Sequence, residues 1–494
     1  MSYVLSLDEG TTSARAALYN ERGERVAMQS VPFDCYYPKP GWVEQDAAAI
    51  WNAQMQATRA VFAQAAVRPD DCAACGVTNQ RETTVVWDRA TGKPISPAIV
   101  WQCRRTADYC RELARSAAAS RIESATGLVI DAYFSASKIR WILDNVTDAR
   151  SKARDGQYLF GNIDTWLIWN LTRGAVHLTD YTNASRTMLM DLESGEWDSE
   201  LLSIFDIPAA MLPRIAPSSG RVGAIQGDLF GAEIPISGIA GDQQAALAGQ
   251  ACFRAGISKN TYGTGCFALT HAGGRVPRSK HRLLGTRASS LNADPQFAVE
   301  GSVFVAGAVV QWLRDSLKLI SSAGETEAIA ASISETGGVH LVPAFVGLGA
   351  PYWDGNARGT ISGLTRASGR AEIVRAALES IAFQSRELID AMELDSGQAI
   401  AELRVDGGAS VNNFLMQFQA DILGKPVVRP VDVETTALGA AYLAGIAEKV
   451  WSGADEVESF WRVERRFEPS MPESERASRM DQWRAAVRRA RSEV

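Results

Sequence analysis

The 494-residue sequence predicts an α/β protein of two domains, each built around a mixed β-sheet. Extended segments open the chain and helical and extended segments alternate after them, which is typical of α/β domains. A strand that ends in aspartate and runs into a glycine-rich turn occurs in both halves, at Asp8 and at Asp406. The chain is also longer than a single hydrophobic core supports, at about 150 residues per domain. We therefore expect two domains, 1–250 and 251–494.

The first half begins with extended segments separated by turns. Apolar stretches bounded by turn residues predict strands at 3–7, 14–19, 25–31 and 73–78. A helix is predicted between the last two strands, because apolar residues recur every three or four positions from Trp51 to Ala65, with Asp46 available as N-cap. This order indicates a mixed sheet.

The second half repeats parts of this pattern. Its predicted elements are a Gly/Thr turn at 260–265, a strand at 297–304, a helix through 373–392, a strand at 403–406 and a helix through 414–422 that stops at Gly424. No Pro- or Ser-rich linker separates the halves near residue 250, so we expect them to share a substantial interface.

Composition excludes several classes of function. Fifty Lys and Arg against 57 Asp and Glu give a net charge of -7, spread along the chain, whereas a dedicated nucleic-acid binder needs clustered positive charge. The longest apolar run, 437–447, is too short to cross a bilayer. The first eight residues lack the features of a signal peptide. We expect a cytoplasmic protein without membrane insertion.

Cysteine and histidine usage argues against a soft-metal site. Seven cysteines are few for this length, and Cys72 and Cys75 have C-x-x-C spacing without a second pair at zinc-finger distance. None of the four histidines has H-x-x-x-H spacing. We expect reduced thiols and, if a metal binds, oxygen ligands.

Three turns are candidates for phosphate binding: 8–13, 262–265 and 406–409. Neither a P-loop nor a G-x-G-x-x-G motif occurs. Gly/Thr and Gly/Gly turns can present backbone N–H groups and hydroxyls to phosphate oxygens. Each turn alone is more often an ordinary hairpin, but three in one chain, two of them after strands that end in aspartate, favour phosphate binding, and these aspartates would suit a cation that bridges phosphates.

Other polar residues allow both a chemical and a plain structural interpretation. Asp242 could accept the proton of an attacking hydroxyl, or could cap the helix that starts at 243. Arg81 and Glu82 could form a site or a surface ion pair. Trp101 lies beside two arginines, an arrangement also expected where core meets surface.

Taken together, these motifs resemble the FGGY family of carbohydrate kinases, and within it the members that phosphorylate glycerol. The similar blocks are 37–44, 78–84, 98–106, 126–131, 179–187, 239–246, 260–266, 347–353, 405–409 and 412–419. The resemblance implies two ribonuclease-H-like domains of the actin, hexokinase and Hsp70 type, with ATP and substrate in the cleft between them. It also implies a homodimer or homotetramer.

The implied activity is transfer of the γ-phosphoryl group of ATP to glycerol, giving sn-glycerol 3-phosphate and ADP, the first step of glycerol catabolism. Asp242 would be the general base, and Asp8 would act on Mg²⁺ through water. The implied glycerol-binding residues are Arg81, Glu82, Trp101, Tyr133, Asp242, Gln243 and Phe267. Those implied for ATP are Thr11, Thr12, Ser13, Arg15 and Thr264 for the phosphates, and Gly307, Gln311, Gly408 and Asn412 for the nucleoside.

Two positions depart from the family pattern. Glu9 replaces a glutamine in the first turn, where a carboxylate would repel phosphates unless it points away or helps to hold the cation. Segment 219–235 lacks the loop that binds fructose 1,6-bisphosphate in some bacterial relatives and the phosphorylatable histidine of others.

Two functions compete with this interpretation. One is a kinase of another polyol or ketose, and the other is a filament-forming or chaperone ATPase.

Overall fold

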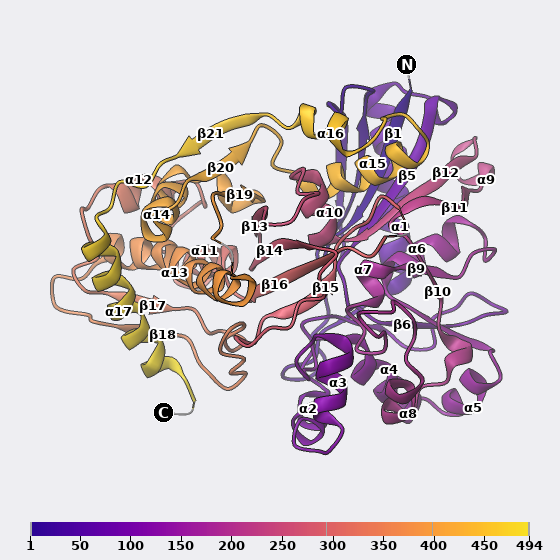
Figure 1. The fold of residues 1–494 in the computed structure, drawn as a ribbon, viewed down its shortest axis with the longest axis horizontal. Helices are drawn as coiled ribbons and strands as arrows, with labels where there is room; N and C mark the ends of the chain where they lie inside the picture. Colours follow the sequence, from indigo (N-terminus) through magenta and orange to yellow (C-terminus); the bar gives the residue numbers. More distant parts are fainter. Residues whose placement is uncertain (1, 293, 398, 493–494) are drawn as a thin grey trace.

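The protein has two lobes, each centred on one β-sheet, in a computed structural model that describes residues 2–292, 294–397 and 399–492 (Figure 1). The strands of the first sheet lie in the order β11 (Ser219–Ile225), β12 (Ile234–Gly241), β5 (Cys72–Asn79), β1 (Tyr3–Glu9), β2 (Ser13–Tyr19) and β3 (Arg25–Pro32). The strands of the second lie in the order β15 (Leu284–Arg287), β16 (Phe297–Val303), β14 (Cys266–Gly273), β13 (Ser258–Tyr262), β19 (Leu403–Asp406), β20 (Val427–Pro430) and β21 (Val463–Phe467).

Both sheets contain the same five-stranded plan. In the first, β1, β2 and β3 pair antiparallel, while β1, β5 and β12 run parallel. In the second, β13, β14 and β16 pair antiparallel, while β13, β19 and β20 run parallel. The mixed sheets predicted from the opening strands and the repeated Asp-turn pattern are therefore present in both halves.

Shorter strand pairs and helices surround the sheets. The pairs are β4 (Glu44–Gln45) with β7 (Ala98–Ile99), β6 (Val85–Asp88) with β8 (Tyr158–Gly161), β9 (Leu178–Asp180) with β10 (Arg214–Ala216), and β17 (His340–Val342) with β18 (Thr360–Ser362). The helices up to the end of the first sheet are α1 (Ala47–Ala65), α2 (Ala107–Leu113), α3 (Ala119–Thr126), α4 (Ser135–Asn145), α5 (Ala149–Arg154), α6 (Ile163–Leu171), α7 (Tyr181–Ala184), α8 (Ser199–Phe205) and α9 (Gly227–Phe230). Those that follow are α10 (Asp242–Gly249), α11 (Gly307–Asp315), α12 (Glu325–Ala331), α13 (Arg370–Ser396), α14 (Asn413–Leu423), α15 (Thr435–Ala447), α16 (Ala454–Phe460) and α17 (Glu473–Ala490).

Local signals place the helix ends as predicted. The Asp46 carboxylate accepts hydrogen bonds from the backbone N–H groups of Ala48 and Ala49 at the start of α1. Gly424 follows α14 with φ 68°, a left-handed conformation that glycine adopts without a Cβ penalty. The predicted strand at 3–7 extends to Glu9, so Asp8 and Glu9 belong to β1.

Helix α15 crosses from the second half of the chain to the first sheet. Figure 1 shows it in yellow beside β1 and β5, and Leu438, Ala441 and Tyr442 share a hydrophobic cluster with Val4. α15 also crosses α10 at backbone distance, because a Cβ on Gly439 would lie 1.8 Å from the carbonyl oxygen of Ala245. Small residues at this crossing let the two halves approach closely.

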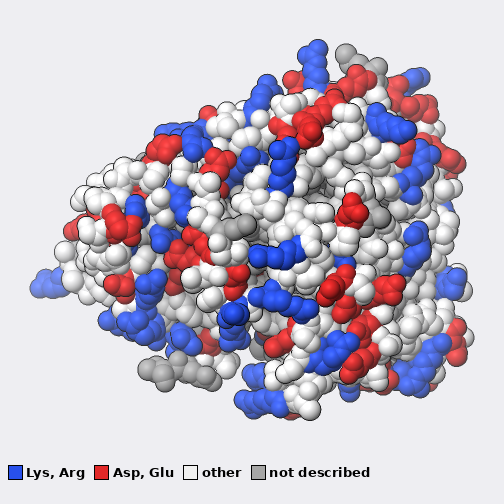
Figure 2. All heavy atoms as spheres, viewed as in Figure 1, with Lys and Arg blue, Asp and Glu red and all other residues white. Residues whose placement is uncertain are grey.

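Surface charge is mixed on the face that Figure 2 shows, where blue and red side chains alternate without a patch of one sign. Within the described ranges, no helix has the length and apolar character needed to cross a membrane. The seven cysteines are unpaired, and Cys72 and Cys75 are both buried.

Candidate functional site

The register of the first sheet brings three chain segments to one edge. Asp8 lies opposite Thr78, and Ala240 also lies opposite Thr78, from the other neighbouring strand. Since β1, β5 and β12 are parallel, the residues that follow them leave the sheet at the same carboxyl edge, where open α/β sheets bind ligands. The turn after β1, the loop after β5 and the start of α10 therefore meet.

Arg81, just after β5, is almost fully buried, with 2% of its side chain exposed. Its Nη1 and Nη2 atoms donate to Glu300 at 2.5 and 2.9 Å, and Nη1 also donates to Gln244 Oε1 at 3.1 Å. Its Nε lies 3.1 Å from Asp242 Oδ1. Buried charges need such partners, because an unpaired one would cost several kcal/mol.

Asp242 is the first residue of α10. The N-cap position belongs to Gly241, so the alternative role of Asp242 as N-cap is wrong, although its Oδ1 accepts a hydrogen bond from the N–H of Gln243 at 2.7 Å. Its side chain is 29% exposed and so remains accessible to a ligand. Burial raises the pKa of Asp242, against the opposing charges of Arg81 and Lys259.

Glu82 is buried with a left-handed backbone conformation, φ 59°. Such a conformation is unusual for a residue with a Cβ and persists where surrounding contacts hold it. Here the hydroxyl of Ser135 donates to its carbonyl oxygen at 3.2 Å, and Arg186 Nε donates to its Oε1 at 2.7 Å. Because Arg81 and Glu82 are both buried, their interpretation as a surface ion pair is wrong.

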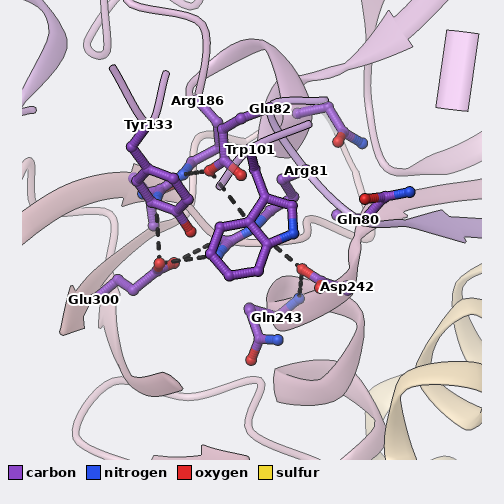
Figure 3. A network of polar contacts seen from close by, with 12 residues as sticks. Gln80, Arg81, Glu82, Trp101, Tyr133, Arg186, Asp242, Gln243 and Glu300 are labelled. Atoms are coloured by element: carbon purple, nitrogen blue, oxygen red, sulfur yellow. Dashed lines mark hydrogen bonds and ion pairs between the residues drawn. The ribbon is translucent and has the colours of Figure 1, made fainter. Parts of the chain in front are cut away.

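Three aromatic side chains stand edge to face beside these charges. The Trp101 ring lies 5.7 Å from that of Tyr133 and 6.2 Å from that of Phe267, which comes from β14 of the second sheet. The indole Nε1 of Trp101 donates to Thr11 Oγ1 at 3.0 Å. The aromatic wall thus touches the turn after β1, and Figure 3 shows Trp101 in front of Arg81 with Asp242 beside it.

The turn after β1 and the beginning of β2 carry four of the expected phosphate-binding residues. Thr12 is exposed, while Thr11, Ser13 and Arg15 are partly buried. Arg15 pairs with Asp8 at 3.2 Å and with Glu434, at the start of α15, at 3.4 Å. The guanidinium is 35% exposed and lies where an incoming anion could compete with these carboxylates.

Glu9 lies on the opposite face of β1 from Asp8. Successive strand residues point to opposite faces, and Leu5 and Leu7 share a cluster with Ile50 of α1, whereas Val4 packs against α15. Glu9 is 0% exposed, and neither carboxylate oxygen has a hydrogen-bond partner among the described residues. Burial, together with the charge of Asp8, raises its pKa well above the usual range. The sequence left open whether Glu9 points away from the phosphates or helps to hold the cation. In the structure its side chain points away from the turn.

The second lobe contains a cavity of about 330 Å³. Its lining includes all five residues expected to bind ATP from this half: Thr264, Gly307, Gln311, Gly408 and Asn412. The backbone at Gly307 packs closely against the turn that carries Thr264, because a Cβ on Gly307 would lie 2.5 Å from the carbonyl oxygen of Gly263. Asn412 caps α14 by accepting a hydrogen bond from the N–H of Leu415. Asp406, the second strand-ending aspartate, instead accepts a hydrogen bond from Gln250 at 2.8 Å.

Three charged residues of the site were missed from the sequence: Arg186, Lys259 and Glu300. Glu300 is 0% exposed on β16, and Arg186 joins it to Glu82. Lys259 on β13 donates to Gln243 Oε1 at 2.6 Å. For Glu300, a single ionisable residue inside the otherwise mostly apolar strand β16 was the available signal, since such a residue is rarely buried without a partner. Arg186, in a turn, and Lys259, in a polar strand, carry no such signal.

Two domain models describe almost the whole chain. The N-terminal domain of the FGGY family of carbohydrate kinases matches residues 3–249, and the C-terminal domain of the same family matches residues 258–448. The chain belongs to the FGGY family of carbohydrate kinases. This confirms the family, and with it the class of enzyme, a phosphotransferase, that the motifs predicted.

Relatives of this FGGY kinase are similar over its full length. It is 57% identical to glycerol kinase 2 of Thermotoga maritima over 99% of both chains, and 56% identical to a glycerol kinase of Caldanaerobacter subterraneus over 99% of this chain and 98% of that one. A crystal structure of Plasmodium falciparum glycerol kinase with ADP superposes with a TM-score of 0.89 at 38% identity, covering 99% of this chain and 98% of the other. A ligand-bound xylulose kinase of Lactobacillus acidophilus, at 22% identity and a TM-score of 0.85 over 99% and 97% of the chains, shares the fold. The predicted fold class is confirmed.

The carboxylates at the edge of the first sheet suit a hard cation. Burial raises the pKa of Asp8 to about 6, against Arg15, and the charges of Glu434 and Asp242 act in the same direction as burial. Among the described residues, no group of three Asp, Glu, His or Cys side chains could hold a metal ion by itself. Mg²⁺ usually keeps several waters and binds through one or two carboxylates plus substrate phosphates, so Asp8 would fit the expected cation as a single carboxylate that acts through water.

Proposed function

We propose that this FGGY kinase phosphorylates glycerol with ATP, giving sn-glycerol 3-phosphate and ADP. The relatives similar over the whole length are named glycerol kinases. The observation that carries the proposal is the hydrogen bond from Trp101 Nε1 to Thr11 Oγ1. It joins the pocket of Arg81 and Asp242 to the turn proposed to hold phosphates, so an acceptor hydroxyl and a γ-phosphoryl group would be neighbours.

The pocket offers the donors and acceptors that a polyol needs. A hydroxyl both donates and accepts, so Arg81 and Gln243 would donate to glycerol while Glu82 and Asp242 accept. The ammonium group of Lys259 has only donors and donates a hydrogen bond to Oε1 of Gln243. The Nε2 donor of that amide therefore remains for substrate. Acceptors that lack a hydroxyl would leave these buried groups unpaired and would be rejected strongly.

The aromatic side chains would cover the C–H face of glycerol and exclude water. Trp101, Tyr133 and Phe267 form this wall. The exclusion of water matters because water would compete with glycerol for the phosphoryl group. The wall combines residues from both lobes, which supports an acceptor site that is complete only when the lobes are together.

Asp242 would act as the general base. Its carboxylate would accept the proton of the terminal hydroxyl during in-line transfer, a contribution of about 10²- to 10⁴-fold. The pKa raised by burial makes it a stronger base than an exposed aspartate. Positioning of the two reactants would supply most of the remaining rate.

The nucleotide would lie between the two lobes. Thr11, Thr12, Ser13, Arg15 and Thr264 would bind the phosphates, and Gly307, Gln311, Gly408 and Asn412 would line the nucleoside side. Asp8 would hold Mg²⁺ through water, and the cation would neutralise phosphate charge. Residues 1–250 would thus bind glycerol and phosphates, and residues 251–494 the nucleotide.

Measurement of ADP formation tests the proposal. Purified protein with MgATP is assayed with glycerol, with erythritol, with xylulose and with no acceptor. Glycerol should give a kcat/KM at least tenfold above the other acceptors, and ADP formation without acceptor should be slow. Preference for another acceptor, or equal ADP formation without one, would refute the proposal in favour of another sugar kinase or an ATPase.

A further inference from the structure

Glu300 joins the two lobes inside the proposed acceptor pocket. It lies on β16 of the second sheet, whereas Arg81 follows β5 of the first, 219 positions away. The two side chains form a bidentate pair with distances of 2.5 and 2.9 Å, and Arg186 Nη2 donates to Glu300 Oε1 at 3.1 Å. Figure 3 shows Glu300 facing both arginines.

The pair is fully desolvated and ionised. Glu300 is 0% exposed and Arg81 2%. Burial alone would favour a neutral carboxyl group, but the charges of Arg186 and Arg81 outweigh it and hold the pKa of Glu300 at about 2. Removing Glu300 would leave Arg81 with the single-point contact to Asp242 in place of a bidentate partner, so the orientation of the guanidinium depends strongly on Glu300.

The contacts of Arg81 leave few donors for a substrate. A guanidinium has five N–H groups. Those on Nη1 donate to Glu300 and Gln244, and one on Nη2 donates to Glu300. Nε lies 3.1 Å from Asp242 Oδ1 without a hydrogen bond to it. The second N–H of Nη2 and the N–H of Nε are the donors left for a polyol hydroxyl, and the planar bidentate pair with Glu300 determines where both point.

We propose that Glu300 is a positioning residue for the acceptor, because it orients Arg81 from the opposite lobe. The affinity for glycerol therefore depends on the relative position of the two lobes. This inference rests on the proposed function. Separation of the lobes would break the pair, and the acceptor pocket would lose its oriented donor at the same time. Glycerol binding and lobe closure are thereby coupled through one ion pair.

Steady-state kinetics of Glu300→Gln and Glu300→Asp test this role. Glutamine is nearly isosteric but uncharged, and aspartate keeps the charge on a shorter side chain. We expect Glu300→Gln to raise the KM for glycerol at least tenfold while the KM for ATP changes less than threefold. Glu300→Asp should raise the KM for glycerol by a smaller factor. Protection by glycerol in a thermal melt should weaken in the same order.

Glu379→Gln is the matched control. Glu379 is also buried and arginine-paired, 2.7 Å from Arg375, but both residues lie on α13. It should lower the melting temperature without changing the KM for glycerol. An unchanged KM for glycerol in Glu300→Gln, or equal rises in both KM values, would overturn the inference; if that variant fails to fold, an unchanged value in Glu300→Asp overturns it. Wild-type protein assayed in parallel separates this outcome from failure of the proposed function, which would abolish activity on glycerol in every variant.

Discussion

The Nε atom of Arg81 lies 3.1 Å from Oδ1 of Asp242, at a point where the arginine is buried and the aspartate is partly exposed. The positive charge favours the ionised carboxylate, and burial opposes it more strongly, so the pKa of Asp242 is raised. An acceptor hydroxyl beside this pair would meet a carboxylate with increased basicity and a cation that keeps it in place.

This relationship predicts how activity depends on pH. A base works when ionised, so activity is present above its pKa and is lost as pH falls through it. Because the pKa of Asp242 is raised, the acid limb of kcat/KM for glycerol should lie above the value of about 3.9 for an exposed aspartate. The measurement uses saturating MgATP, so that titration of Asp8 in the free nucleotide site does not contribute to the profile. Recovery of activity at pH 7.5 after acid exposure serves as the control that excludes unfolding.

An acid limb at or below about 3.9 would contradict the assignment of Asp242 as the base.

Glu9→Gln should leave the apparent affinity for MgATP unchanged, within about twofold. The side chain lies on the α1 side of β1, away from Arg15, so its charge does not face the proposed phosphate site. Arg15→Ala is the positive control: loss of a charged hydrogen bond worth about 1.5–3 kcal/mol should raise the KM for ATP roughly 10- to 100-fold. A clear weakening by Glu9→Gln would mean that Glu9 helps to hold the cation.

Gly307→Ala should weaken ATP binding. The new methyl group would lie 2.5 Å from the carbonyl oxygen of Gly263 and would displace the turn that carries Thr264. We expect the KM for ATP to rise at least tenfold and the KM for glycerol to change less than threefold. At Gly274 the nearest atom to a Cβ is the carbonyl oxygen of Pro295 at 3.8 Å, so Gly274→Ala serves as control. An unaltered KM for ATP in Gly307→Ala would argue against this turn as part of the nucleotide site.

Fructose 1,6-bisphosphate should not inhibit the enzyme. Segment 219–235 forms β11, α9 and the beginning of β12, and it lacks the Gly-Gly-Lys-Gly-Gly-Thr-Arg loop. Titration of the bisphosphate against glycerol-dependent ADP formation, with sodium sulfate at equal ionic strength as control, checks this. Saturable inhibition specific to the bisphosphate would show that another surface binds it.

Elements with strong local signals could be predicted from the sequence. Asp46 and Gly424 mark helix ends through contacts within a few residues, and the strand at 403–406 has a regular alternation. Site residues in contiguous motifs, such as Arg81 and Asp242, could likewise be named. Their burial could not be predicted, because it depends on how β5 and β12 meet in the sheet.

Residues that act across the two lobes escaped prediction. Glu300 is the single ionisable residue of its strand, which signals a buried partner but does not identify it, because the pair with Arg81 forms only in the folded chain. The same holds for Lys259, whose partner Gln243 lies 16 positions earlier on another element. The division at residue 250 and the expected homodimer or homotetramer stay predictions; sedimentation velocity checks the latter.

Turnover of Asp242→Asn tests the central claim most directly, namely that Asp242 accepts the proton of glycerol during phosphoryl transfer. Asparagine keeps the size of the side chain and an oxygen for the N–H of Gln243, but it cannot act as base. We predict a kcat at least tenfold lower, with ATP affinity by calorimetry within threefold of wild type. Turnover close to wild type in this variant would contradict the account.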